Sequence, residues 1–332
     1  MTHYILRDDV YSDDIEQEPI RAGFGRGLKI AGTANESIVA LCADLTESTQ
    51  MNHFKEAFPE RFVEIGVAEQ NLVTVASGMA RAGKIPFTSS YAAFSPGRNW
   101  EQIRTTICLN DMPVKVVGSH AGISVGPDGA THQMLEDIAL MRVLPNMVVV
   151  APGDSIEAEK ATIALANNGR PSYLRLARDK SPVYSTQESP FEIGKAYVLR
   201  EGHDISLLGT GAMSYQLLKA AHLLEKQGIH AEVIHVPTIK PLDEATILAS
   251  IRKTGRVVTS EEAQAAGGFG SAVAELLGEQ LPTPIKRIGM YDRFGESGAP
   301  SELLEYFGLN AEKMAVTIQE FVNNTPKYHQ GF

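Results

Sequence analysis

The sequence predicts an α/β protein of two domains, each built on a mainly parallel sheet flanked by helices. Its 332 residues are enough for about two domains of roughly 100–200 residues each. Short runs rich in Val, Ile and Leu alternate with segments of helical period, which is typical of parallel strands covered by helices. The polar segment 185–190 has no apolar periodicity and therefore predicts a linker between the domains.

An N-terminal extension at 1–20 is expected to precede the first domain at 21–184, and the second domain is expected at 191–332. In the first domain the apolar runs predict strands at 38–43, 61–66, 114–118, 147–151 and 173–176. A helix at 70–82 would turn one apolar stripe towards the sheet, namely Leu72, Val75, Ala76 and Met79. In the second domain strands are predicted at 205–208, 232–236, 257–259 and 285–288.

Composition and charge exclude several classes of function. The formal net charge is −10, so long-range electrostatics oppose binding to nucleic acid or to an anionic membrane. The two cysteines, Cys42 in an expected strand and Cys108 in an expected helix, are interpreted as reduced core thiols. No run of 18 apolar residues occurs, and the N-terminus lacks the apolar core of a signal peptide. We therefore expect a cytoplasmic protein.

One acidic residue at a predicted strand end and two aromatic residues farther along the chain are candidates for a ligand site. In the string Glu-Ile-Gly-Val-Ala-Glu-Gln at 64–70, Glu69 follows a strand and opens a helix, so its carboxyl can lie at the sheet edge where α/β proteins bind ligands. A single glutamate there is more often only a partner of the helix dipole. Tyr91 and Phe94 offer faces for a planar ring, although two aromatic residues alone are more typical of a core.

A second string, Gly-Pro-Asp-Gly-Ala-Thr-His-Gln at 126–133, is more specific. Its first four residues alone would predict only a turn. The longer string adds His132 to Asp128, and His120 precedes it by a few residues. No compact set of His, Cys, Asp and Glu ligands accompanies these residues, so no metal site is predicted within this chain.

Together these strings resemble the pyrimidine-binding half of transketolases, and the resemblance runs from about Arg21 to Gly308. It implies a site for thiamine diphosphate in which Glu69 hydrogen-bonds the aminopyrimidine, as a buried carboxyl that favours the protonated form can do. It also implies cofactor contacts from Tyr91, Phe94 and Asp44. The family's third aromatic residue would fall at Gly97, so that contact is either lost or supplied by Arg98.

The resemblance also implies substrate contacts. Asp128 and His132 would hydrogen-bond the hydroxyls of the donor sugar, and His120 would reach the acceptor, so these three join Glu69 as the predicted catalytic residues. Guanidinium groups bind phosphate through paired hydrogen bonds. The predicted set for the sugar phosphate is Arg21, Ser48, His120 and Arg178.

Half of a complete transketolase is not recognisable in the chain. The diphosphate-binding half carries a Gly-Asp-Gly motif with an asparagine downstream, and their oxygens hold Mg²⁺. No such pair occurs in this sequence. We therefore expect a separate N-terminal subunit that supplies the Mg²⁺ ligands to a shared thiamine diphosphate site, and a dimer of this chain within a heterotetramer. Three glycine-containing strings in the second domain are assigned to packing and assembly: 209–211, 267–270 and 292–298.

The implied reaction moves a two-carbon ketol unit from a ketose phosphate to an aldose, with pentose phosphates as the default pair. Three alternatives stay open. The β subunit of a 2-oxo acid dehydrogenase E1 lacks the Thr-His-Gln string and the phosphate set. Deoxyxylulose-phosphate synthase shares that string but normally has another residue where His120 stands. A non-catalytic scaffold would not need Glu69, Asp128 and His132 together.

Overall fold

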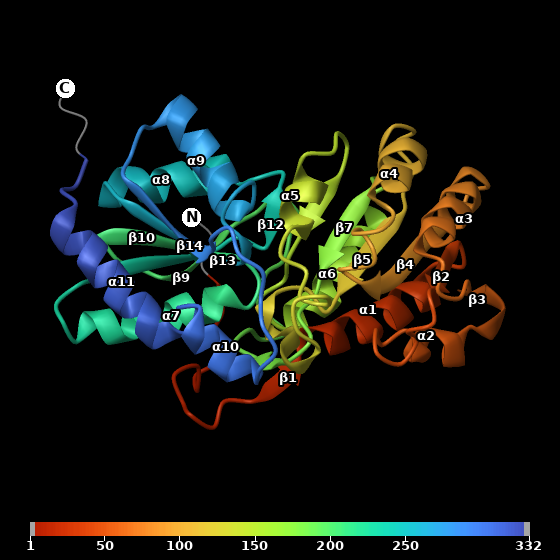
Figure 1. Ribbon diagram of the computed structural model, residues 1–332, viewed down its shortest axis with the longest axis horizontal. Coiled ribbons are helices and arrows are strands. Elements are labelled where there is room, and N and C mark those ends of the chain that lie inside the picture. Colours follow the sequence, from red (N-terminus) through yellow and green to blue (C-terminus); the bar gives the residue numbers. More distant parts are fainter. Residues whose placement is uncertain (1–3, 329–332) are drawn as a thin grey trace.

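The computed structural model describes residues 4–328 and shows two α/β halves side by side (Figure 1). Each half holds one sheet, of seven strands in the first and five in the second. All strand pairs are parallel in both sheets except one antiparallel pair at an edge of each. The predicted two-domain α/β class is therefore confirmed.

The first sheet has the strand order β12-β6-β7-β5-β4-β2-β3. Its central strands are buried along their whole length, which explains their near-continuous apolar runs. The bounds are β2 Ile38–Cys42, β3 Phe62–Glu64, β4 Ile85–Tyr91, β5 Lys115–Ser119, β6 Val148–Val150, β7 Ser172–Arg175 and β12 Thr238–Lys240.

Helices cover both faces of this sheet. Helix α1 packs closely on α6 because its glycines leave no side chain between them: a Cβ on Gly23 would lie 1.7 Å from the carbonyl oxygen of Ser155. The predicted stripe of the helix at 70–82 packs on the core, and the helix begins one residue earlier than expected, at Glu69. The bounds are α1 Ile20–Ala34, α2 Asn52–Ala57, η1 Pro59–Arg61, α3 Glu69–Arg81, α4 Trp100–Gln102, η2 Ile103–Cys108, η3 Ile123–Asp128, α5 Asp137–Arg142 and α6 Ser155–Asn167.

The second sheet has the order β14-β13-β10-β11-β9, with β9 antiparallel at its edge. Its strands are β9 Tyr197–Arg200, β10 Ile205–Gly209, β11 Ala231–His235, β13 Val257–Gln264 and β14 Ile285–Met290. Its helices are α7 Met213–Glu225, α8 Glu244–Thr254, α9 Phe269–Gln280, α10 Pro300–Tyr306 and α11 Ala311–Asn324.

Several segments tie the two halves together. Strand β12 follows β11 in the chain but pairs with β6 of the first sheet. Near the N-terminus, β1 (Gln17–Pro19) pairs with β8 (Lys180–Pro182), and Tyr4 packs on Tyr184 and Tyr197. Within 185–190, three backbone carbonyls accept hydrogen bonds from Lys160 Nζ, at 2.6–2.9 Å. The domain boundaries drawn from the sequence stay a prediction.

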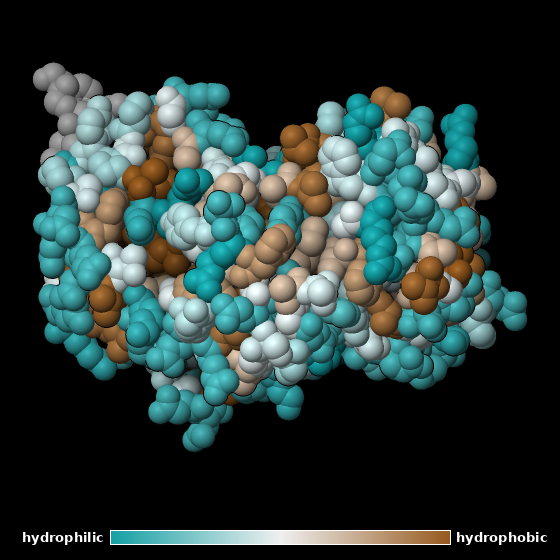
Figure 2. Space-filling model, in the orientation of Figure 1, coloured by the Kyte–Doolittle hydropathy of each residue, from teal (hydrophilic) through white to brown (hydrophobic). Residues whose placement is uncertain are grey.

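In the seven- and five-stranded sheets, apolar runs failed to predict three strands. β4 contains Pro86 and the buried Ser89 and Ser90, and β9 and β12 are short edge strands. Both cysteines are free and buried, as predicted. Among residues 4–328, no helix is long and apolar enough to cross a membrane. Figure 2 shows a notch between the halves at the upper edge of the molecule, where a groove of about 520 Å³ runs between α5 and residues of β12, α8 and α9.

Candidate active site

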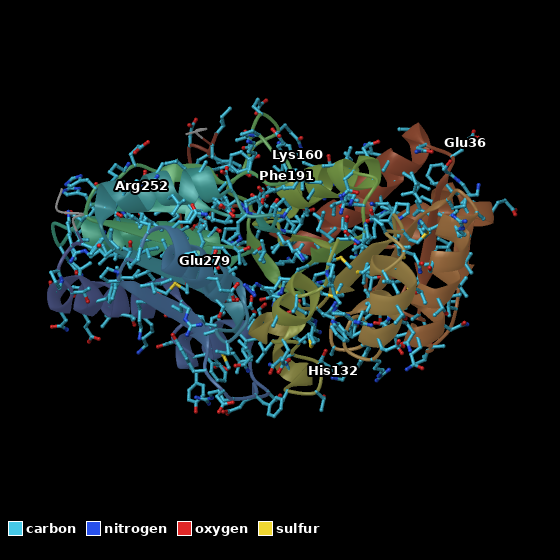
Figure 3. The ribbon with its side chains drawn as sticks, turned by 90° about the horizontal axis from the view of Figure 1, so that it is seen from above. Glu36, His132, Lys160, Phe191, Arg252 and Glu279 are labelled. Atoms are coloured by element: carbon cyan, nitrogen blue, oxygen red, sulfur yellow. The ribbon has the colours of Figure 1, made fainter. Side chains whose placement is uncertain are left out.

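The carboxyl edge of the first sheet gathers the predicted site residues. Asp44 follows β2, Glu69 follows β3, Tyr91 ends β4, His120 follows β5 and Arg178 follows β7. Parallel strands present their carboxyl ends at one edge, so residues far apart in the sequence become neighbours there. The string 126–133 forms a loop after β5, and Figure 3 places its His132 on a loop at one margin of the molecule, across from Lys160 and Phe191.

Glu69 is held in place by an ion pair and by its backbone. It is the first residue of α3, its side chain is 5% exposed, and Arg98 Nη1 lies 3.1 and 3.2 Å from its two carboxylate oxygens. The Arg98 guanidinium lies 4.1 Å from the centre of the Phe94 ring. Asn99 Nδ2 donates to the Glu69 backbone carbonyl, at 2.8 Å. Glu69 is thereby linked through Arg98 to the Phe94 ring.

These groups fit an aminopyrimidine. A carboxylate has about four acceptor positions, so the single Nη1 contact of Arg98 leaves positions for a donor such as a protonated ring nitrogen. Tyr91 and Phe94 are half-buried, and their rings lie 5.9 Å apart at an interplanar angle of 24°. Such faces suit a planar heterocycle. The pair between Arg98 and Glu69 was not foreseen, because the sequence offered Arg98 only as a substitute for a missing aromatic contact.

The two histidines lie against the same aromatic residues. The His120 imidazole stacks on Tyr91 at 3.8 Å, and the His132 imidazole meets Phe94 edge-on at 5.4 Å. His120 Nδ1 lies 2.9 Å from the Ser119 hydroxyl oxygen. Burial, reinforced by the positive charges of Arg21 and Arg178, lowers the pKa of His120 to about 3. His120 is therefore neutral near pH 7 and acts as a hydrogen-bonding group.

Arg21 and Arg178 line a cleft of about 380 Å³. Arg21 Nη1 donates to the backbone carbonyl of Arg178, and Arg178 Nη1 donates to the carbonyl of Val125. Burial and the neighbouring Arg178 lower the pKa of Arg21, and its buried Nε has no hydrogen-bond partner among the described residues. Two guanidinium groups at one cleft favour an anionic occupant such as a phosphate.

Two predicted residues are not joined to these groups. Asp44 is exposed at a left-handed φ of 56°, and its backbone N–H donates to Glu64. Ser48 is half-buried in the loop before α2, and within residues 4–328 no hydrogen bond or ion pair links it to either arginine. Their cofactor and phosphate roles remain predictions.

The glycine strings of the second domain do not form open anion sites. The N–H groups of Thr210 and Gly211 donate to the carbonyls of Ser260 and Ala151. At the start of α9, the N–H groups of Phe269 and Gly270 donate to the buried Glu261 carboxylate. These four N–H groups therefore have partners within the chain.

Comparison with known proteins decides the family. Residues 17–183 match the transketolase pyrimidine-binding domain, and residues 194–314 match the transketolase C-terminal domain. The chain belongs to the transketolase family. It is 44% identical over 304 residues to a transketolase C-terminal section of Methanocaldococcus jannaschii, covering 91% of this chain and 95% of that protein.

Two further matches also cover most of this chain and most of the matched protein. A 6-deoxy-6-sulfo-D-fructose transketolase subunit of Clostridium sp. MSTE9 is 42% identical over 286 residues, which are 86% of this chain and 89% of that protein. A solved structure described as a split gene transketolase, inactive beta4 tetramer, has a TM-score of 0.86 and 43% identity, covering 92% of this chain and 98% of that chain. The transketolase pyrimidine domain indicates dependence on thiamine diphosphate.

Proposed function

We propose that this chain is one subunit of a transketolase-type transferase, which moves a two-carbon ketol unit from a ketose phosphate to an aldose. The observation that carries the proposal is the buried Glu69 side chain, paired with the Arg98 that covers the Phe94 ring, on the same sheet edge as the cleft of Arg21 and Arg178. A carboxyl for a pyrimidine and a cationic cleft for a sugar phosphate are the two recognition elements that this reaction needs.

The residues at this edge would divide the work. Thiamine diphosphate, when bound, supplies the carbon nucleophile that attacks the donor carbonyl. Glu69 would hydrogen-bond the pyrimidine ring and control its proton, while Tyr91 and Phe94 flank that ring. Asp128 and His132 would hydrogen-bond the donor hydroxyls and move protons at them. Neutral His120 would hydrogen-bond the acceptor, and Arg21 and Arg178 would hold the phosphate.

The second half of the site would come from another polypeptide. Relatives of almost the same length include a transketolase C-terminal section and a transketolase subunit, which supports a split enzyme. We propose an N-terminal subunit with a Gly-Asp-Gly motif and a downstream asparagine, which would bind Mg²⁺ and the diphosphate. The assembly would be a cytoplasmic heterotetramer around a dimer of this chain.

The test is ketol transfer by this chain alone, by a roughly 250–300 residue partner with that motif, and by the two co-expressed. The assay would include thiamine diphosphate, Mg²⁺, and a panel of pentose phosphates and branched or sulfonated sugars. We expect transfer only with both chains. Robust transfer by this chain alone would refute the split site. If pyruvate rather than a ketose phosphate serves as donor, the deoxyxylulose-phosphate synthase alternative is correct.

A further inference from the structure

The loop that carries Asp128 and His132 is held by the second domain. Gln133, at the end of the loop, donates from Nε2 to the backbone carbonyl of Glu296, at 2.8 Å. The same Nε2 lies 3.2 Å from the carbonyls of Ile123 and Gly126, at the start of the loop. One buried amide therefore closes the loop on itself and fastens it to the string 292–298.

The string 292–298 is shaped for this contact. A Cβ on Gly295 would lie 1.9 Å from Gln133 Oε1 and 2.5 Å from Ile123 Cδ1, so only glycine leaves room for the amide. Two residues later, Ser297 Oγ donates to the carbonyl of Pro127, at 2.6 Å. The loop touches this string on both sides of Asp128.

A third attachment comes from β13. Its Glu262 side chain is buried, and the carboxylate accepts a hydrogen bond from the backbone N–H of Ser124. Arg175 Nη2 donates to the Glu262 backbone carbonyl at 2.8 Å, and Arg175 Nε donates to Asp137 at 2.8 Å. Glu262 is thus braced by the first domain while it holds the start of the loop.

The loop needs such support. Gly126 and Gly129 both have positive φ, at 78° and 71°, so the backbone on either side of Asp128 is of the kind that retains most freedom when unfolded. A displacement of about 1 Å in a group that orients a substrate can cost about 10²-fold in rate. Fixing Asp128 and His132 is therefore a kinetic requirement as well as a structural one.

We propose that the second domain positions the sugar-binding loop 123–133. Gln133 and Glu262 are positioning residues that act through Asp128 and His132. Gly295 leaves room for the Gln133 amide, and Ser297 adds a hydrogen bond to the loop. The proposal rests on the proposed function for its kinetic consequence. It gives the transketolase C-terminal domain of this chain a role in donor turnover, in addition to packing and assembly.

The first test uses the isolated chain and needs no activity. Gln133→Met removes the NH2 group that the three carbonyls share, at similar volume, and Gly295→Ala displaces the same amide from the other side. In hydrogen–deuterium exchange, peptides within 123–132 should exchange at least about tenfold faster in both variants, with β4 and β5 unchanged. Gln280→Met is the matched control, because it loses only a surface hydrogen bond to Glu244. Unchanged exchange in 123–132 would overturn the proposal.

The second test uses the assembled complex. Both variants should lower kcat for donor cleavage about 10- to 100-fold while hydrogen–deuterium exchange at C2 of the bound cofactor stays at the wild-type rate. Glu262→Leu should behave alike, and Glu262→Gln should restore turnover, since its amide oxygen still accepts from Ser124. A loosened loop with wild-type turnover, or loss of C2 exchange together with turnover, would contradict the positioning role. Failure of the wild-type complex to transfer ketol units would instead reject the proposed function.

Discussion

The carboxyl edges of the two parallel sheets differ in where their polar groups find partners. At the first edge, Arg21 keeps a buried Nε without a partner among the described residues and lines a cleft with Arg178, while Tyr91 and His120 stack on each other. At the second edge several polar groups are paired within the chain, although the buried Thr210 hydroxyl has no hydrogen-bond partner among the described residues. His235, for example, lies 2.6 Å from both the Glu157 carboxylate and the Ser214 hydroxyl, and is completely buried.

Two carboxylates of β13 are further examples of pairing at the second edge. Glu261 accepts from the N–H groups at the start of α9, and Glu262 accepts from Ser124 of the first domain. Burial raises the pKa of Glu261 to about 7. In the proposed function the first edge offers polar groups to ligands, whereas the two carboxylates of the second edge hold the start of a helix and a loop.

The largest expected effect is the loss of activity on substitution of Glu69, at the edge of the first sheet. Glu69→Ala should lower ketol transfer by the complex at least about 10²-fold, because it removes the group that controls the pyrimidine proton. The fold should be spared, since the partner Arg98 is 51% exposed and can turn to solvent. Steady-state kinetics measures the loss of ketol transfer, and the melting temperature shows whether the fold is spared.

Glu101→Ala is the control for Glu69, because Glu101 also stands in the first turn of a helix but is exposed. It should leave turnover unchanged. A near-normal kcat in Glu69→Ala would show that the first edge does not act through this carboxyl.

The arginine cleft gives the next effect. Arg178→Ala and Arg21→Ala should each raise KM for phosphorylated sugars about ten- to a hundredfold, because a charge-assisted hydrogen bond is worth about 1.5–3 kcal/mol. KM for unphosphorylated analogues should change much less. Arg170→Ala, at a half-exposed arginine paired with Asp111, is the control. Equal changes in KM for phosphorylated and unphosphorylated sugars would show that the two arginines have a structural role and do not bind the phosphate.

The smallest expected effect is a difference in the pH dependence of stability. The pKa of Glu261 is raised from 4.5 to about 7, so its stabilising contribution is complete below pH 4.5 and declines as the pH rises to 7. The pKa of His120 is lowered from 6.5 to about 3, so stability at the first edge is complete above pH 6.5 and declines as the pH falls. The two edges therefore respond to pH in opposite directions.

Urea unfolding of the isolated chain between pH 5 and 7 measures this. Relative to Glu261→Gln, wild type should lose about 1–2 kcal/mol as the pH rises, and relative to His120→Gln it should lose a similar amount as the pH falls. Parallel pH profiles for wild type and both variants would mean that neither group titrates differently in the folded chain.

Sequence reasoning could predict the class of the fold because buried parallel strands are apolar throughout. The run 38–43 became β2, within one residue. It could not predict β4, whose buried Ser89 and Ser90 break the apolar run, since a serine in a central strand looks like a loop residue until its neighbours are known. Nor could it assign β12 to the first sheet, because that pairing joins segments almost 90 residues apart.

The candidate site shows the same limit. A strand end and the resemblance to transketolases predicted Glu69, the resemblance alone predicted His120 and Arg178, and the sheet brings all three to one edge. The contact of Arg98 with Glu69 and the attachment of Gln133 to 292–298 are tertiary, and no local pattern encodes them. Gln133 did carry a signal, since it belongs to the string 126–133, but the string alone does not say which residue binds sugar and which one holds the loop.

The most direct test of the first edge as the active site is hydrogen–deuterium exchange at C2 of thiamine diphosphate, followed by NMR in the assembled complex. Glu69 begins α3, whereas Asp128 and His132 belong to the string 126–133 after β5, so the variants should fail differently. Glu69→Ala should suppress the exchange itself. Asp128→Ala and His132→Ala should leave it largely intact while donor cleavage falls sharply. An equal collapse of exchange in all three variants would contradict the account and make the loop a part of the cofactor's own scaffold.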